Sequence, residues 1–145
     1  MKYLLDASAL VELFLRLEAE ELVNILRDCC ILDLTVYEFC NALWKLAKIR
    51  KRISEKTAIS GAKLLEKIIS GKGIVVISEL TKLDDKMKSS LKHYINVYDI
   101  SYIHVAREKN LTLITEDSGM HTNARNLFNL EVLYVDEFLK LFNEN

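Results

Sequence analysis

The sequence alternates short apolar runs with longer stretches in which apolar residues recur at helical spacing, and this alternation restricts the fold most strongly. Five runs predict β-strands: Tyr3 to Leu5, Ile31 to Leu34, Ile74 to Ile77, Leu111 to Ile114, and Val132 to Val135. Strands that alternate with helices predict a parallel sheet joined by right-handed crossovers. We therefore expect a doubly wound α/β fold of three layers, with helices on both faces of a mostly parallel central sheet of about five strands.

Length and composition are those of a globular chain. The chain has 145 residues, half of them hydrophobic, and a formal net charge of −1. It contains no tract rich in Gly, Ser or Pro that would mark a linker, so we expect residues 1–145 to form a single domain. No run approaches the ~18 apolar residues of a membrane span, and MKYLLDASAL meets an acid too early for a signal peptide. The prediction is a cytoplasmic protein that does not associate with a membrane.

Cysteine and histidine do not form a recognisable zinc site. Cys29, Cys30 and Cys40 contain no C-x-x-C pair, and an odd number leaves one over in any disulfide scheme. We expect them to be small buried hydrophobic residues in a reducing compartment. The three histidines lack the short spacings of zinc ligands.

Four acidic residues fall where the expected topology places one edge of the sheet. Asp6 follows the first predicted strand, Glu38 follows the second, and Asp117 follows the fourth. The carboxyl ends of parallel strands lie at one edge, so we expect these three side chains to be neighbours. Asp99 opens the helix before the fourth strand, and it joins them only if the chain between Ile77 and Asp99 returns to that edge.

Each acid taken singly also has a structural explanation. Asp6, Asp99 and Asp117 stand at predicted helix starts, where a carboxylate accepts free backbone N–H groups. The stretch from Thr35 to Glu38 has the S/T-x-x-E form of a capping box, which would give Glu38 a purely structural role. Four acids at one edge, however, repel one another unless a cation binds or their pKa values rise. Capping and metal binding are both open interpretations of the sequence.

The chemistry that suits such a cluster is hydrolysis assisted by Mg²⁺ or Mn²⁺. Hard divalent cations prefer oxygen ligands, and Mg²⁺ commonly combines a few carboxylates with waters and substrate phosphate oxygens. A cation of this kind can activate water for attack on a phosphodiester. Ser8, Asn41 and Thr115 lie near the acids in the sequence and are candidates to orient ligands or waters. Ordinary helix-start hydroxyls and an exposed amide explain them equally well.

Several motifs resemble the PIN domain family. They are Asp6-Ala7-Ser8, Glu38 with Asn41, the stretch YDISYIHVAREKN that begins at Tyr98, and LTLITED, which ends at Asp117. The C-terminal motifs are the more specific: an Asp opens a helix, a basic and polar turn follows, and an apolar strand ends in Thr-x-Asp. The resemblance spans nearly the whole chain, and the short form most resembles the VapC-type toxins of toxin–antitoxin pairs.

The resemblance implies a PIN-like fold over residues 1–145 and a metal-dependent endoribonuclease, the toxin of a type II toxin–antitoxin system. It implies that Asp6, Glu38, Asp99 and Asp117 form a quartet that binds Mg²⁺ or Mn²⁺ and carries catalysis, supported by Ser8, Asn41 and Thr115. It also implies RNA as the substrate, a small antitoxin as a partner, and a homodimer. Glu116 directly precedes Asp117, and the family's Thr-x-Asp pattern favours Asp117 as the ligand.

Features outside the quartet are less specific. The basic residues Lys45, Lys48, Lys51 and Arg52 could contact RNA phosphates, although a solvated polar face explains them as well. Tyr37 and Trp44 could stack on bases, although aromatic residues of an amphipathic helix more often belong to the core. Two functional alternatives stand beside the toxin: a PIN-like module that binds RNA or protein without catalysis, and a PIN nuclease of RNA processing.

Overall fold

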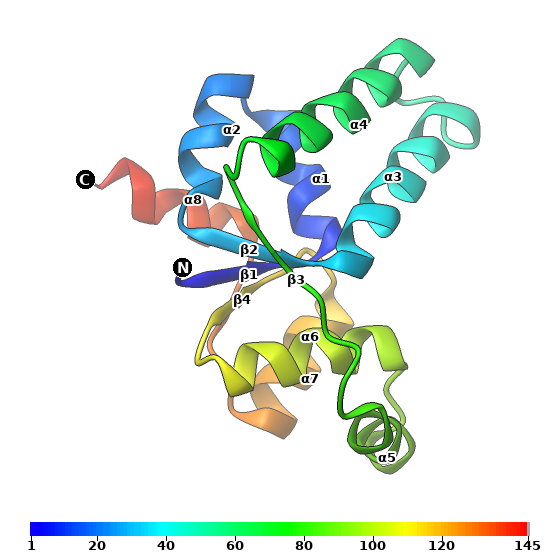
Figure 1. The fold of residues 1–145 in the computed structure, drawn as a ribbon, viewed down its shortest axis with the longest axis vertical. Coiled ribbons are helices and arrows are strands. Elements are labelled where there is room, and N and C mark those ends of the chain that lie inside the picture. Colours follow the sequence, from blue (N-terminus) through cyan, green and yellow to red (C-terminus); the bar gives the residue numbers. More distant parts are fainter. Residues whose placement is uncertain (145) are drawn as a thin grey trace.

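The computed structural model describes residues 1–144, and its centre is a five-stranded parallel sheet (Figure 1). The strands are β1 (Tyr3–Leu5), β2 (Cys29–Leu32), β3 (Val75–Ile77), β4 (Thr112–Ile114) and β5 (Val132–Leu133). Their order in the sheet is β3-β2-β1-β4-β5. The chain therefore moves outward from β1 to β3 on one side and then to β5 on the other, which confirms the predicted doubly wound α/β fold.

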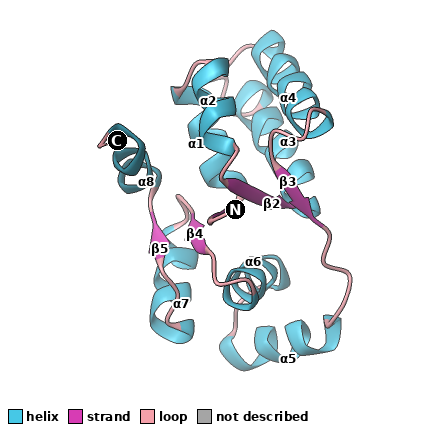
Figure 2. Ribbon diagram, turned by 60° about the vertical axis from the view of Figure 1, so that its left-hand side comes forward, coloured by secondary structure: helices cyan, strands magenta, loops and turns pink. Residues whose placement is uncertain are grey.

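Helices cover both faces of this sheet and complete three layers (Figure 2). One face carries α1 (Ala7–Arg16), α2 (Ala19–Leu26), α3 (Asp33–Lys48), α4 (Glu55–Ser70) and α8 (Val135–Asn143). The other carries α5 (Leu83–His93), α6 (Val97–Glu108) and α7 (Ser118–Phe128). None of the helices within residues 1–144 combines the length and the apolar character needed to cross a membrane.

Successive residues of the strands contribute to two separate cores. Leu5 and Cys29 belong to the core beneath α1, α3 and α8, whereas Leu4 and Cys30 belong to the core beneath α6 and α7. This alternation follows from the two-residue period of a strand, which sends neighbouring side chains to opposite faces. The two buried cysteines are free thiols, as is the half-buried Cys40. The expectation of small buried hydrophobic residues is therefore confirmed for Cys29 and Cys30.

The prediction and the structure differ most at the end of the second strand. The predicted strand continues to Leu34 and the predicted helix begins at Thr35, but β2 ends at Leu32 and α3 begins at Asp33. Thr35 lies inside the first turn, where its Oγ1 accepts a hydrogen bond from the N–H of Leu32 at 3.0 Å. The capping-box interpretation of Thr35 and Glu38 is therefore wrong, because Thr35 caps the helix from within and leaves Glu38 available for other contacts.

Candidate acidic active site

The order of the strands reverses between β1 and β4, and Asp6 and Asp117 stand at the carboxyl edge of this switch point. Open parallel sheets bind ligands in the crevice at such a position. Asp6 accepts a hydrogen bond from the N–H of Ala9 at 2.8 Å and caps α1. Asp117 accepts one from the N–H of Met120 at 2.8 Å and caps α7. The capping interpretation is thus correct for both residues, and each retains a place at the edge where a ligand would bind.

A hydrogen-bond network joins these two acids. Ser8 Oγ donates to one oxygen of Asp6 at 2.7 Å, and Thr115 Oγ1 donates to the other. The N–H of Asp117 in turn donates to Thr115 Oγ1 at 3.0 Å. Glu116 also joins the network, because its N–H donates to Ser8 Oγ at 2.9 Å. The two hydroxyls orient the Asp6 carboxylate and connect it to the segment that follows β4.

Glu116 and Asp117 have different environments. The Glu116 carboxylate accepts a hydrogen bond at 2.7 Å from the N–H of Val135, the first residue of α8. Asp117 lies close enough to Asp6 for its negative charge to raise the pKa of the Asp6 carboxyl. Glu116 therefore stabilises the start of α8, whereas Asp117 belongs with Asp6.

Glu38 on α3 and Asp99 on α6 form a second pair. The hydroxyl of Tyr102 donates to the Glu38 carboxylate at 2.8 Å and lies 2.7 Å from Thr35 Oγ1. Asn96 caps α6: its carbonyl oxygen accepts from the N–H of Asp99 at 2.9 Å, and its amide donates to the Asp99 carboxylate at 3.1 Å. The chain after β3 thus returns Asp99 to the edge that carries the other acids, as the topology requires.

The negative charges of the four acids interact. Burial raises the pKa of Asp6 to about 6, although hydrogen bonds to its carboxylate oppose the rise. Burial also raises the pKa of Asp99, to which the charge of Asp117 adds, and the pKa of Glu38, to which the charge of Asp99 adds. Within residues 1–144, no lysine or arginine forms an ion pair with any member of the quartet. The quartet is a concentration of negative charge that bound cations or protons can offset.

The donor set of the quartet fits a hard divalent cation. All four side chains offer carboxylate oxygens, and the buried pair of oxygens on Asp6 is already oriented by hydroxyl groups. Across the part of the chain that the structure describes, no three acidic, histidine or cysteine side chains stand close enough to enclose an ion directly. Mg²⁺ is compatible with such spacing, because it retains several waters through which more distant carboxylates can bind.

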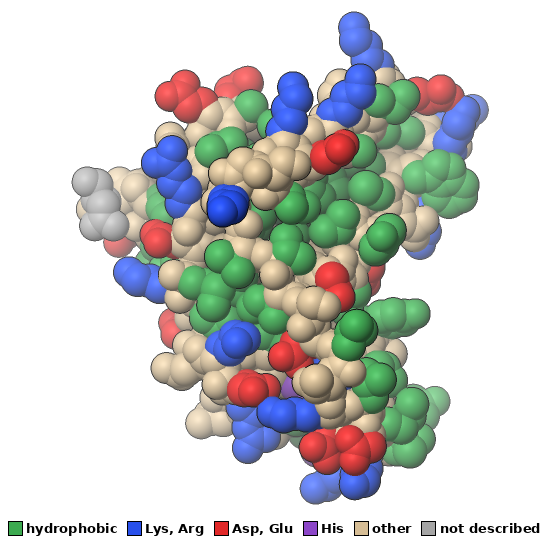
Figure 3. Space-filling model, viewed as in Figure 1, with side chains coloured by type: hydrophobic (Ala, Val, Ile, Leu, Met, Phe, Trp, Pro, Cys, Tyr) green, Lys and Arg blue, Asp and Glu red, His purple; other side chains and the backbone are tan. Residues whose placement is uncertain are grey.

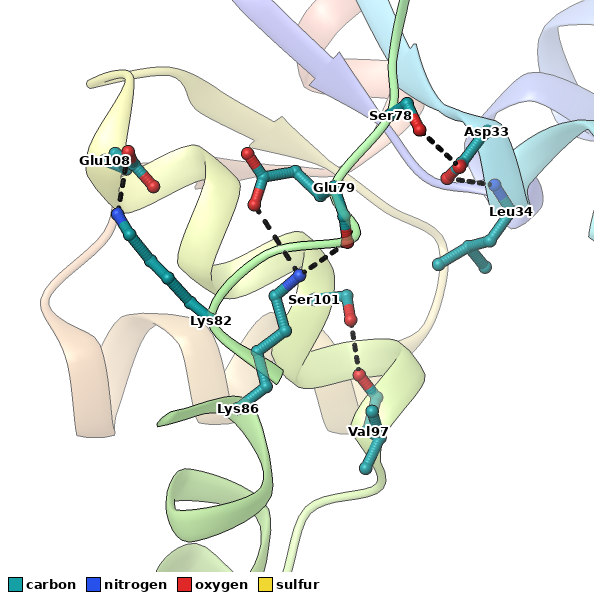
Figure 4. Close-up of polar contacts among 9 residues, drawn as sticks. All are labelled: Asp33, Leu34, Ser78, Glu79, Lys82, Lys86, Val97, Ser101 and Glu108. Carbon is teal, nitrogen blue, oxygen red and sulfur yellow. Dashed lines mark hydrogen bonds and ion pairs between the residues drawn. The ribbon is translucent and has the colours of Figure 1, made fainter. Parts of the chain in front are cut away.

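Polar contacts beyond the quartet hold the helices on either side of it (Figure 4). Ser78 Oγ, which follows β3, donates to the Asp33 carboxylate at the start of α3 at 3.1 Å. The next residue, Glu79, binds the buried Lys86 of α5: Lys86 Nζ donates to the Glu79 carbonyl at 3.0 Å and lies 3.6 Å from its carboxylate. The loop after β3 therefore connects the first residue of α3 with α5, and α5 is followed by α6.

Sequence reasoning missed two residues of this site, Asn96 and Tyr102. Asn96 stands three residues before Asp99, which is the spacing of a helix cap followed by an acid, so a signal was available. Tyr102 lies one turn after Asp99 and is almost fully buried; a hydroxyl on an apolar helix face implies a polar partner nearby. Asn41, one turn after Glu38, is exposed and makes no side-chain hydrogen bond with the described residues.

The predicted RNA-contacting residues occupy the far half of α3 and the turn beyond it. Lys45, Lys51 and Arg52 are exposed, while Lys48 forms an ion pair with Glu55.

The aromatic residues of α3 differ from the expectation that they belong to the core. Tyr37 is 79% exposed and Trp44 is 52% exposed. Their helix packs through other side chains, among them the buried Phe39 and Leu43.

Comparison with known proteins agrees with this architecture. The family model of the PIN domain matches residues 3–126. Exonuclease VapC9 of Pyrobaculum aerophilum is 30% identical over 135 residues, which cover 93% of this chain and 95% of that protein. Ribonuclease VapC3 of the same organism is 34% identical over 122 residues, which cover 81% of this chain and 90% of that protein.

A solved structure is similar over the full length of the chain. The crystal structure of PAE2754 from Pyrobaculum aerophilum matches with a TM-score of 0.78 and 28% identity, covering 100% of this chain and 97% of that one. The family match extends from β1 into α7 and so includes the segments that carry all four acids. The chain belongs to the PIN domain family.

Proposed function

We propose that this protein is a metal-dependent endoribonuclease that hydrolyses RNA phosphodiester bonds at Asp6, Glu38, Asp99 and Asp117. The observation that carries the proposal is the gathering of four interacting carboxylates, without a basic partner among the described residues, at the switch point of a parallel sheet. Two relatives are named as a ribonuclease and an exonuclease, which supports nuclease chemistry for this chain.

We assign Mg²⁺ or Mn²⁺ to the quartet. Bound there, the cation would supply Lewis-acid activation of water and offset negative charge on the phosphodiester. Hydrogen bonds from neighbouring residues of the chain orient the carboxylates for binding the cation. Asp6 is only 4% exposed, and Ser8 and Thr115 fix its two oxygens. Asp117 is exposed, and one of its oxygens accepts a hydrogen bond from the N–H of Met120, so its side chain is accessible from solvent.

Polar contacts also fix the remaining two acids, one contact part-buried and the other exposed. Tyr102 holds Glu38 by its hydroxyl, and Asn96 holds Asp99 by its amide. Both partners are themselves restrained, Tyr102 by the hydroxyl of Thr35 and Asn96 by its place at the helix cap. Because hydrogen bonds already hold these carboxylates in place, the carboxylates need not reorient when the substrate binds.

The proposal includes further assignments that follow from the family. We propose that the protein is the toxin of a type II toxin–antitoxin pair in the cytoplasm, with a small antitoxin as partner and a homodimer as its assembly. The names of the VapC relatives support the toxin assignment. Asn41 is a candidate to orient ligands or waters beside Glu38. Lys45, Lys51 and Arg52 are candidates for phosphate contacts, joined by Lys48 when it leaves Glu55.

A circular single-stranded RNA tests the reaction type, because it has no end from which an exonuclease can start. With Mg²⁺ or Mn²⁺ we expect the purified protein to convert the circle into linear fragments. EDTA should stop the reaction, and an excess of the cation should restore it. Cleavage that persists in EDTA would contradict metal dependence. Degradation of linear RNA with the circle left intact would show that the protein is an exonuclease and not an endonuclease. Inactivity on all RNAs would favour the PIN-like module that binds RNA or protein without catalysis.

Tyr102→Phe tests whether the hydroxyl that holds Glu38 matters for activity. We expect a loss of roughly 10- to 100-fold in kcat/KM, the range typical for partners of metal-binding side chains. The stability should fall by only about 1 kcal/mol, because one hydrogen-bonded hydroxyl is removed. Tyr3→Phe is the matched control, since the Tyr3 ring packs on Phe138, within the other core of the sheet. Equal activity of the two variants would show that Tyr102 does not position Glu38.

A further inference from the structure

Asp117 differs from the other three acids in what holds its carboxylate. Asp6, Glu38 and Asp99 each accept a hydrogen bond from the side-chain hydroxyl or amide of another residue. Within residues 1–144, no side chain donates to the Asp117 carboxylate, which accepts from the N–H of Met120 in the helix that it caps. The first turn of α7 therefore determines where this carboxylate lies. The charge of Asp117 raises the pKa of both Asp6 and Asp99, so a shift of that turn would alter two further members of the quartet.

The chain before Asp117 is bound to the residues that join β5 to α8. The N–H of Thr115 donates to the carbonyl of Leu133 at 3.1 Å and continues the pairing of β4 with β5. The Glu116 carboxylate accepts from the N–H of Val135 at 2.7 Å. These two contacts fix the strand side of Asp117, and other contacts must fix the helix that follows it.

An aromatic stack binds the first turn of α7 to the same junction. The ring of His121 lies parallel to the ring of Tyr134, with centroids 4.0 Å apart and planes 4° apart. The N–H of His121 donates to the carbonyl of Asp117 at 2.9 Å, and Tyr134 directly precedes α8. His121 is 9% exposed, and its buried Nε2 makes no hydrogen bond with the described residues. The face of its ring is therefore the contact by which His121 reaches the start of α8.

We infer that His121 and Tyr134 are positioning residues, whose stacked rings hold Asp117 at the quartet by fixing the first turn of α7 against the start of α8. The inference rests on the proposed nuclease function and adds two residues to it. Parallel rings in contact restrict the rotation of the helix start that would swing the Asp117 carboxylate. The carboxylate is then in place before a cation binds.

Other contacts of α7 provide a comparison for the stack. Met120 and Ala124 pack in the core that α7 shares with α6. At the end of α7 away from Asp117, Phe128 contacts His93 of α5, with ring centroids 4.9 Å apart and planes at 65°. This pair also joins a histidine to an aromatic ring. It therefore separates a local effect on the acid from a general loosening of the helix.

The stack is distinct from the exposed hydrophobic surface of the molecule. Figure 3 shows hydrophobic side chains exposed along the right-hand edge, from α3 down to α5. Such a surface suits contact with a partner protein. His121 is buried and Tyr134 is half-buried, so their stack is a contact within the chain.

Amide hydrogen exchange in EDTA tests the inference, because it reports on the start of α7 without metal or RNA. The probe is the N–H of Met120, which donates to Asp117. We expect His121→Ala and Tyr134→Leu each to speed its exchange by about 3- to 10-fold, the factor that one aromatic pair contributes. The N–H of Ala9, at the start of α1, should exchange at an unchanged rate. His121→Phe keeps a ring that can stack and should stay within about twofold of the wild type.

Binding of Mn²⁺, measured from the electron paramagnetic resonance of the free ion, is the second readout. His121→Ala and Tyr134→Leu should bind the ion about 3- to 10-fold more weakly. An excess of Mn²⁺ should restore their cleavage of RNA, because the Asp117 carboxylate is displaced and not removed. His93→Ala is the matched control and should bind Mn²⁺ within about twofold of the wild type.

Three outcomes would overturn the inference while a wild type that binds Mn²⁺ and cleaves RNA leaves the proposed function intact. Stack variants that unfold at lower temperature but keep the exchange rate of Met120 and the affinity for Mn²⁺ would make the stack a packing contact alone. Equal losses in His121→Ala and His121→Phe would assign the contact to the imidazole nitrogens. An equal loss in His93→Ala would show a general loosening of α7. A wild type that neither binds Mn²⁺ nor cleaves RNA would remove the proposed function together with the inference.

Discussion

Asp99→Asn is expected to reduce RNA cleavage by at least about a hundredfold, because even the partners of metal-binding side chains typically contribute 10- to 100-fold. The amide keeps the shape of the side chain but not its charge. The cap of α6 survives, since Asn96 accepts its hydrogen bond from the backbone N–H of residue 99. The change also removes the repulsion that Asp99 exerts on Glu38. We therefore expect an inactive protein that is folded and no less stable than the wild type.

Cleavage rates with Mg²⁺ or Mn²⁺ check this expectation, alongside thermal unfolding of the same samples. Asp84→Asn is the matched control, because it removes the same charge from an exposed position on α5. Expression in cells gives a second measurement that addresses the toxin assignment: the wild type should arrest growth and Asp99→Asn should not. If Asp99→Asn is as active as the control variant, the assignment of Asp99 to the quartet is contradicted.

Asp6→Asn is expected to remove activity and yet to stabilise the metal-free protein at neutral and alkaline pH. Burial raises the pKa of Asp6 from 3.8 to about 6, so ionising it in the folded state costs free energy. This shift corresponds to about 1 to 3 kcal/mol once weaker hydrogen bonding to an amide is allowed for. The variant carries no charge at this position and avoids the cost.

The sign of the pH dependence follows from the raised pKa. The folded wild type binds a proton more readily than the unfolded chain, so its stability declines as the pH rises from about 4 to about 6. Above about pH 6 the cost is complete, and the advantage of Asp6→Asn should be greatest there. Near pH 4 the two proteins should unfold at similar temperatures. Calorimetry in EDTA across this range is the measurement, and a variant less stable than the wild type at about pH 8 would contradict the expectation.

Adding Mg²⁺ or Mn²⁺ extends the same experiment. A ligand that binds only the folded state raises its stability, so the cation should stabilise the wild type and not Asp6→Asn. Asp6→Ala is a useful comparison, because it removes the cap of α1 together with the charge. Similar stabilisation of wild type and Asp6→Asn by the cation would place its site elsewhere.

The sequence was sufficient to place the acids that follow β1 and β4 at one edge of the sheet. Asp6 and Asp117 could be predicted because short apolar runs locate β1 and β4, and parallel strands end at a common edge. Glu38 was harder, since a local capping pattern gave it a competing role that only the start of α3 at Asp33 excluded. A local sequence pattern cannot decide between such roles, because the deciding contact is made by a residue from a distant part of the chain.

The remaining features depend on contacts between distant segments. Tyr102 reaches Glu38 across 64 positions of the chain, and no periodicity within either helix indicates this contact. The exposure of Tyr37 has the same cause: a helical pattern shows which positions share a face, and the packed neighbours determine which face is buried. The single-domain expectation for residues 1–145 remains a prediction.

The quartet takes Asp6 and Glu38 from the N-terminal half of the chain and Asp99 and Asp117 from the C-terminal half. Repulsion between the pairs opposes the packing of one half against the other, along the junction of β1 with β4. Whatever offsets this charge strengthens that junction, so a cation bound at the quartet would raise the folding free energy of the whole molecule. Without an offsetting charge the fold is less stable than its hydrophobic cores alone would make it, and a cation bound at the quartet would help to hold the two halves together.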